Sequence, residues 1–136
     1  MNVMIDLNVF LDLFQERLPH YHNSSQVLTM ALNEEITGVI AGHSLTTLFY
    51  LVSKFSGREK AFEVVDWVLG RFDVESADKD GFRHARTFDM KDYEDAVVVT
   101  CAQNANCDYI VTRNTPDFKN SPIPSVTPGE FLLMFQ

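Results

Sequence analysis

Three acidic side chains in this chain stand beside apolar runs that lie far apart in the sequence. Asp6 follows the first run, Asp95 opens a second apolar segment, and Asp117 comes shortly after a third. Carboxylates that are brought close together repel one another unless a cation lies between them. Mg²⁺ and Mn²⁺ prefer oxygen ligands of this kind. The pattern therefore predicts a divalent-metal site, which suits the hydrolysis of a phosphodiester.

Two further oxygen-bearing side chains accompany these acids, Glu94 beside Asp95 and Asn114 after the third apolar run. Each acid also has a simpler, structural interpretation. An aspartate after a strand often caps a helix or closes a turn, and acids in the first turn of a helix complement its dipole. Taken singly, each acid is more often structural than catalytic. Their joint placement at one predicted edge favours the metal site.

The elements that must position these residues alternate between strands and helices. Strands are predicted at residues 2–5, 37–41, 72–74, 109–112 and 125–126, and helices at 9–14, 23–32, from a Ser44 cap to the break at Gly57, 59–69, 79–87, 92–105 and 128–135. This alternation predicts an α/β fold with a mostly parallel sheet. In such a sheet the strand ends and the starts of the helices that lead back to it share one edge, where ligands bind.

Composition bounds the function only broadly. With 136 residues, 46% of them hydrophobic, the chain suits a single domain over 1–136. A net charge of −8 argues against nonspecific coating of nucleic acid, but it is compatible with a nucleic-acid enzyme. Two cysteines and the lack of a signal peptide predict a reduced, cytoplasmic compartment. The uncharged stretch 36–53 is interrupted by polar residues, so no membrane span is expected.

Three blocks of the sequence together resemble the PIN domain, in particular its small prokaryotic members related to the toxin ribonucleases of VapBC-type toxin–antitoxin pairs. The blocks read VMIDLNVFLD at 3–12, DYEDA at 92–96 and DYIVTRN at 108–114, the last followed by Asp117 and Phe118. The resemblance covers essentially the whole chain. It implies a three-layer α/β/α sandwich with a mostly parallel central sheet.

The resemblance also implies an activity and partners. It points to a Mg²⁺- or Mn²⁺-dependent endoribonuclease that cleaves RNA, to a possible cognate antitoxin, and to a homodimer. Asp6 and Asp95 match two of the acids of that family, and the acid after the fourth strand falls on Asn114 or Asp117. Asp6, Asp95 and Asp117 are thus the expected catalytic residues, and Glu94 and Asn114 complete the expected metal ligands.

Three more positions carry expected supporting roles, and one of them departs from the family pattern. Asn8 and Thr112 match residues that support the first aspartate and the site. The family usually has a glutamate in the helix after the second strand, where this chain has Thr47 or a neighbour. A threonine offers a neutral oxygen in place of a carboxylate. The alternative is therefore a weakened PIN module that binds RNA or a protein without cutting.

Other readings of the sequence are weaker. Arg113 stands beside the proposed site, where it would contact a substrate phosphate or form a surface ion pair. A phosphatase of the Asp-x-Asp type needs a second acid where this chain has Asn8, and a receiver domain needs an acidic pair before Asp6. Aromatic residues over 49–67 are expected mainly in the core, and any exposed remainder predicts a dimer face or a groove for a partner.

Overall fold

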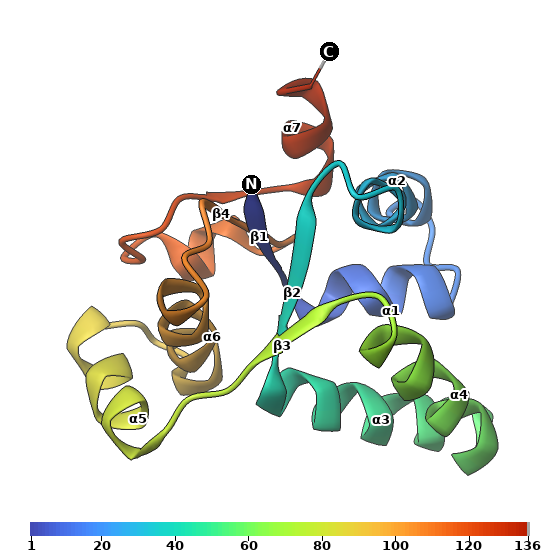
Figure 1. Ribbon diagram of the computed structural model, residues 1–136, viewed down its shortest axis with the longest axis horizontal. Coiled ribbons are helices and arrows are strands. Elements are labelled where there is room, and N and C mark those ends of the chain that lie inside the picture. Colours follow the sequence, from blue (N-terminus) through green and yellow to red (C-terminus); the bar gives the residue numbers. More distant parts are fainter. Residues whose placement is uncertain (136) are drawn as a thin grey trace.

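The computed structural model describes residues 1–135, and its centre is a parallel sheet of five strands (Figure 1). The strands lie in the order β3-β2-β1-β4-β5. Their bounds are Asn2–Ile5 for β1, Thr37–Ala41 for β2, Asp73–Glu75 for β3, Tyr109–Val111 for β4 and Ser125–Val126 for β5. All four pairings are parallel, as the alternation of strands and helices predicts.

Helices cover both faces of this sheet, so the fold is the three-layer α/β/α sandwich that the resemblance to the PIN domain implies (Figure 1). On one face lie α1 (Leu7–Phe14), α2 (Tyr21–Leu32), α3 (Gly42–Ser56), α4 (Arg58–Leu69) and α7 (Pro128–Leu133). The other face is covered by α5 (Lys79–Ala85), α6 (Tyr93–Asn104) and two 3-10 helices, Arg86–Phe88 and Thr115–Phe118.

The alternation of side chains along the central strand creates the two cores. Val3 and Ile5 of β1 join the cluster under α1 to α4, whereas Met4 joins the cluster under α6. Successive side chains of a strand point to opposite faces, so a strand covered on both faces has to be apolar throughout. This explains why the run before Asp6 contains no polar residue after Asn2.

Element boundaries differ from the sequence-based expectation in a few places. The Ser44 cap is wrong: α3 begins at Gly42, directly after β2, and Ala41 precedes it without a side-chain cap. A side chain at position 42 would clash with Ser76, so a glycine allows the segment after β3 to pack closely against the start of α3. Strand β3 begins one residue later than expected, and α5 ends at Ala85 before a 3-10 turn.

Strand direction decides where the acids gather. Because every strand is parallel, Asp6 after β1, Thr112 after β4 and the start of α3 after β2 all lie at the carboxyl edge of the sheet. Helix α6 leads into β4, so it starts at that same edge. Within residues 1–135 the structure contains no helix that is long and apolar enough to cross a bilayer.

Candidate active site

A cavity of about 200 Å³ opens at the carboxyl edge of the sheet. Its walls come from β1 and the start of α1, from the start of α3, from the start of α6, and from the segment after β4. The residues that line it are Asp6, Leu7, Asn8, His43, Ser44, Asp92, Glu94, Asp95, Val98, Asn114 and Asp117. The acids expected from the sequence to share a site therefore do line one cavity.

Asp6 is the most firmly held of these acids. Its Oδ1 accepts a hydrogen bond of 2.9 Å from the backbone N–H of Leu7, which caps α1, and its Oδ2 accepts one of 2.7 Å from the Thr112 hydroxyl. The Asp6 backbone N–H donates to the carbonyl of Val111 at 2.9 Å. The side chain is only 7% exposed. Asp6 is thus both the helix cap of the structural interpretation and the deepest acid of the cavity.

Burial raises the pKa of Asp6 above its usual range, and the negative charge of Asp92 adds to this effect. Several contacts oppose the rise in pKa. The hydroxyl of Thr112 and the N–H of Leu7 stabilise the charged form, and so does the positive charge of Arg113. Together these effects leave the pKa of Asp6 raised, while a hydrogen bond to each oxygen fixes the orientation of the carboxyl group.

Asp95 lies on the first turn of α6, facing the same cavity. Its backbone N–H donates a hydrogen bond of 3.1 Å to Asp92 Oδ1, so Asp92 caps the helix as the sequence predicts. Partial burial is the main reason that the pKa of Asp95 rises to about 7. The charges of Asp6, Asp92, Asp117 and Glu94 raise it further. Asp95 thus combines burial with the repulsion of four neighbouring acids, and perturbed carboxyl groups of this kind cluster at functional sites.

The remaining predicted residues occupy the rim and the support of the cavity. Glu94, Asn114 and Asp117 line it from exposed positions, and Asn8 lines it beside Asp6. Thr112 is fully buried behind them. Its Oγ1 donates to Asp6 and accepts the backbone N–H of Asn114 at 3.1 Å. Thr112 therefore ties the segment after β4 to the acid after β1.

Helix α3 contributes different residues from the one expected. Thr47 does not line the cavity, and its hydroxyl donates to the carbonyl of His43 within the helix at 3.1 Å. His43 and Ser44 line the cavity instead. The His43 ring nitrogen Nε2 lies 3.2 Å from the carbonyl oxygen of Glu94, so it connects α3 to the start of α6.

The donor set of the cavity matches a hard divalent cation, since it offers carboxylate and amide oxygens and the surrounding acids raise the pKa of Asp95. The spacing of the acids is looser than a finished ligand set. Across residues 1–135, no three His, Cys, Asp or Glu side chains are grouped closely enough to hold a metal ion as they stand. The acids thus line one cavity and influence one another through their charges, and their oxygen atoms are of the type that a divalent cation prefers.

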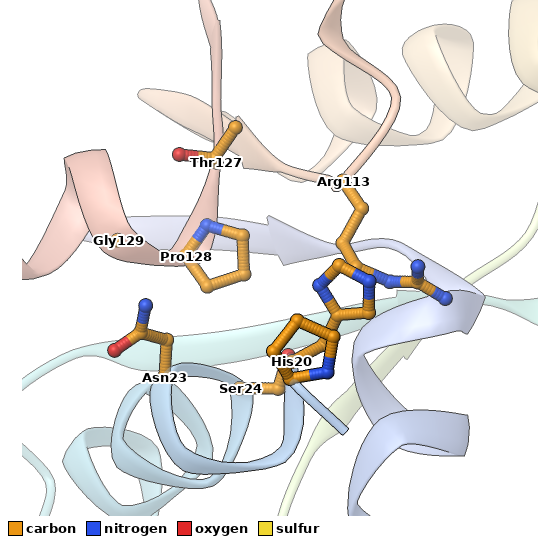
Figure 2. A pocket seen from close by; sticks show the side chains of 8 residues that line it. His20, Asn23, Ser24, Arg113, Thr127, Pro128 and Gly129 are labelled. Carbon is orange, nitrogen blue, oxygen red and sulfur yellow. The ribbon is translucent and has the colours of Figure 1, made fainter. Parts of the chain in front are cut away.

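Arg113 does not line the acid cavity. Its Nε lies 3.0 Å from Oδ2 of Asp12, which is fully buried and also accepts a hydrogen bond of 2.7 Å from the hydroxyl of Ser24. Arg113 borders a second cavity, of about 360 Å³, between α2 and the start of α7 (Figure 2). The N–H direction of Nε misses the oxygen, so the contact is an ion pair and not an aligned hydrogen bond.

Sequence reasoning missed the buried Asp12 and its partners, although a signal was present. Asp12 is a charged residue among the apolar side chains of α1, and Arg113 is a cation directly after a buried strand. A buried charge needs a partner of opposite sign. The two residues are the natural candidates for each other. The cavity roles of His43 and Ser44 carry no comparable signal in the sequence.

The chain is similar to known proteins over nearly its whole length. A family model described as PIN domain matches residues 2–116. Ribonuclease VapC1 of Aquifex aeolicus is 25% identical over 138 residues, which cover 95% of this chain and 92% of that protein.

Solved structures are similar in fold at lower identity. The crystal structure of VapBC2 from Rickettsia felis, bound to a DNA fragment of its promoter, gives a TM-score of 0.70 at 20% identity and covers 93% of this chain and 98% of that one. VapC20 of Mycobacterium tuberculosis, a toxin that cleaves the sarcin–ricin loop, gives a TM-score of 0.67 at 12% identity over 88% of this chain and 92% of that one.

Proposed function

Because the chain belongs to the PIN-domain family, we propose that it is a divalent-metal-dependent endoribonuclease and the toxin of a toxin–antitoxin pair. One observation carries this proposal above the others. Asp6 and Asp95 come from distant segments and line a single cavity, where the charge of Asp6 raises the pKa of Asp95. A structural cap or a surface acid has no need of that arrangement.

Asp6 and Asp95 would hold Mg²⁺ or Mn²⁺, and Glu94, Asn114 and Asp117 would supply further oxygens from the rim. When bound, such an ion supplies positive charge that offsets the charge developing on a phosphate, and it makes nearby water more acidic. Asp117 is the third acid of the proposed catalytic set. Asn8 and Thr112 would keep the deep end of the cavity in place.

The hydrogen bonds of Asp6 prepare it for this role. Thr112 and the N–H of Leu7 each take one lone pair of the carboxylate and leave others free toward the cavity. The side chain therefore loses little conformational freedom when it accepts a ligand. Such preorganisation of a binding group lowers the cost of binding.

Asp95 performs a different task. With a pKa of about 7, its carboxyl group retains a proton about half of the time at neutral pH when no cation is present. A cation has to displace that proton, so binding releases a proton and strengthens as the pH rises. Asp95 therefore makes cation binding depend on pH near neutrality.

The comparisons support the proposed substrate and partners. The relative from Aquifex aeolicus is a ribonuclease, and several similar structures are complexes of a toxin with its antitoxin. We therefore propose RNA as the substrate and a cognate antitoxin as a protein partner. A homodimer is a separate proposal, and it rests on the exposed aromatic side chains of α3 and α4. The two free thiols, Cys101 and Cys107, suit the reducing cytoplasm as the compartment.

A second candidate is a module that binds RNA or a protein without cutting. It is favoured by the position of Thr47, whose hydroxyl bonds within α3, and by the loose spacing of the acids. Calorimetric titration of the protein with Mn²⁺ separates the two candidates. Heat that saturates at millimolar metal or below supports the enzyme, and no heat in that range supports the module.

The variants Asp6→Asn and Asp95→Asn test the enzyme directly. Each removes one charge from the cavity, and we expect each to lower Mn²⁺-dependent cleavage of RNA at least ~100-fold. In Asp6→Asn, the oxygen of the new amide can accept the Leu7 N–H while its NH2 group donates to the Thr112 hydroxyl oxygen, so the fold should survive. Cleavage is measured on single-stranded and structured RNA, with EDTA in parallel.

The matched control is Asp108→Asn. Asp108 is exposed and directly precedes β4, so it lies at the opposite edge of the sheet from the cavity. We expect this variant to cleave like the unmodified chain. Normal cleavage by both Asp6→Asn and Asp95→Asn, with circular dichroism showing folded protein, would refute the enzyme.

A further inference from the structure

We propose that the second cavity, bounded by α2, Arg113 and the start of α7, binds one unstacked nucleobase of the RNA beside the acid site. The inference rests on the proposed function, because it assigns a substrate contact to a ribonuclease. The cavity measures about 360 Å³ and is separate from the one that the acids line. That volume falls in the range of sites for small ligands, about 300–1,000 Å³.

The walls of this cavity combine flat rings with hydrogen-bonding groups (Figure 2). His20 and Asn23 come from the start of α2, Pro128 lies across from them, and Arg113 borders the cavity with its guanidinium directed away from Pro128 and Asn23. Unstacked RNA bases are bound by stacking on aromatic rings such as histidine, with polar groups that contact the base edge. His20 offers the plane, and the Asn23 amide offers both a donor and an acceptor.

The charge of the cavity favours a base over a phosphate. Arg113 is the cation in the wall, and its Nε lies 3.0 Å from Oδ2 of the fully buried Asp12. The hydroxyl of Ser24, also in the wall, donates to the same oxygen at 2.7 Å. The buried carboxylate therefore offsets the guanidinium charge. A polar, uncharged ring suits such a wall better than an anion does.

The position of the cavity ties it to the acid site. Thr112 donates to Asp6, Arg113 lines the second cavity, and Asn114 lines the acid cavity. These three residues are consecutive, so neighbouring Cα atoms are only about 3.8 Å apart. The Arg113 charge also reaches Asp6, where it lowers the pKa of that carboxyl. We therefore assign the second cavity to the base of a nucleotide near the scissile phosphate.

The test uses the full chain in EDTA, so that divalent metal does not contribute to binding. The probes are the four ribonucleoside 5′-monophosphates, and inorganic phosphate is the comparison. Amide shifts in ¹H–¹⁵N spectra report binding. We expect the nucleotides to shift the amides of His20, Asn23 and Arg113 at millimolar concentration, with one base preferred, and phosphate alone to leave those amides unchanged.

Two variants on α2 measure the contribution of the wall. His20→Ala and Asn23→Ala should each weaken nucleotide binding, by about 5- to 100-fold for the stacking residue. The His20 ring makes no capping bond and Asn23 is exposed, so both variants should fold. His22→Ala and Gln26→Ala are the matched controls, since both residues are exposed on α2 and line neither cavity. They should bind like the unmodified chain.

The outcomes separate this inference from the proposed function. Unchanged nucleotide binding by His20→Ala and Asn23→Ala, equal shifts with inorganic phosphate, or no shift at millimolar nucleotide would each overturn the base site. Mapping of cleavage sites in Mn²⁺ adds a second readout, and His20→Ala should flatten the base preference next to the cut. If His20→Ala cleaves RNA with an unchanged base preference, the base site is refuted and the ribonuclease is not. If the chain binds nucleotides at these residues but cleaves no RNA, the ribonuclease is refuted and the base site is not.

Discussion

Asp6 shows how one residue serves structure and chemistry together. Its backbone continues the pairing of β1 with β4, its carboxylate caps α1, and the same carboxylate forms the floor of the acid cavity. The structural interpretation of an acid after a strand is therefore correct and does not compete with the functional one. The hydrogen bonds that cap the helix also fix the orientation of the carboxylate, which preorganises it to bind a ligand.

Asp95 predicts how stability depends on pH. Its pKa is raised from 3.8 to about 7 in the folded chain. Between these values the folded state binds more protons than the unfolded state, so the free energy of unfolding falls as the pH rises from about 4 to 7. We expect Asp95→Asn to flatten this decline, measured by urea unfolding in EDTA at several pH values.

The same experiment with Mn²⁺ provides the control. A bound cation favours the ionised form of Asp95 and so lowers its pKa, and the chain with metal should lose less stability as the pH rises. An equal decline in Asp95→Asn and the unmodified chain would contradict the assignment. Asp6, whose pKa is also raised, contributes to the decline with the same sign.

At the scale of elements, the buried pair of Asp12 and Arg113 connects three segments. Asp12 lies on α1, Ser24 on α2, and Arg113 follows β4. The sequence predicts each of these elements from its apolar pattern. It does not predict the pair, because the angle between α1 and α2 decides which side chains meet. The same limit applies to Thr47, whose direction depends on how α3 is rotated against the sheet.

Breaking this pair should destabilise the fold. Asp12→Ala leaves the Arg113 guanidinium without its buried partner, and the loss of one member of a buried pair costs about 3–5 kcal/mol. Urea unfolding at pH 7 measures the change in the free energy of unfolding. The matched control is Asp80→Ala, because Asp80 forms an exposed pair with Arg83 at 3.6 Å. An exposed pair contributes about 0–1 kcal/mol.

A double variant makes this prediction sharper. Replacing both charges with apolar side chains, as in Asp12→Leu with Arg113→Met, should recover most of the stability that Asp12→Ala loses. The free hydroxyl of Ser24 is then the remaining cost. A loss below about 1 kcal/mol in Asp12→Ala would show that the ion pair contributes little.

At the scale of the molecule, the sequence predicts the architecture well because the topology follows from a simple pattern. Apolar runs too short for helices, such as residues 3–5 and 109–111, alternate with longer amphipathic segments, which leaves a parallel sheet as the consistent solution. That topology then brings the acids to one edge without any knowledge of side-chain contacts. The second cavity has no such pattern, because its walls come from turns and helix starts.

The α3 and α4 helices lie together at one end of the molecule (Figure 1). Both helices carry large aromatic side chains that are exposed. Tyr50 is 61% exposed, Phe55 75% and Phe62 45%. Tyr50 and Phe55 lie on α3 and Phe62 lies on α4, and exposed large apolar side chains are typical of interaction surfaces. They are the exposed remainder that the sequence leads us to look for, and we assign them to the proposed homodimer.

We expect Phe55→Glu to convert the dimer into a monomer, since a charge in an apolar interface loses its hydration without gaining a partner. Sedimentation velocity of the chain without its partner measures the change. Phe82→Glu is the matched control, because Phe82 is 42% exposed on α5, which covers the other face of the sheet. A chain that remains dimeric with glutamate at position 55 would move the interface elsewhere.

The pairing of Asp12 with Arg113 also bears on how this sequence can change over evolutionary time. A substitution at either position alone leaves the other charge without its partner, so a single replacement lowers the stability of the fold. Paired replacement avoids that penalty, but it also alters the wall next to His20 and Asn23. Positions 12 and 113 should therefore covary among related sequences. In relatives that have replaced both residues, we expect the base preference of the second cavity to differ.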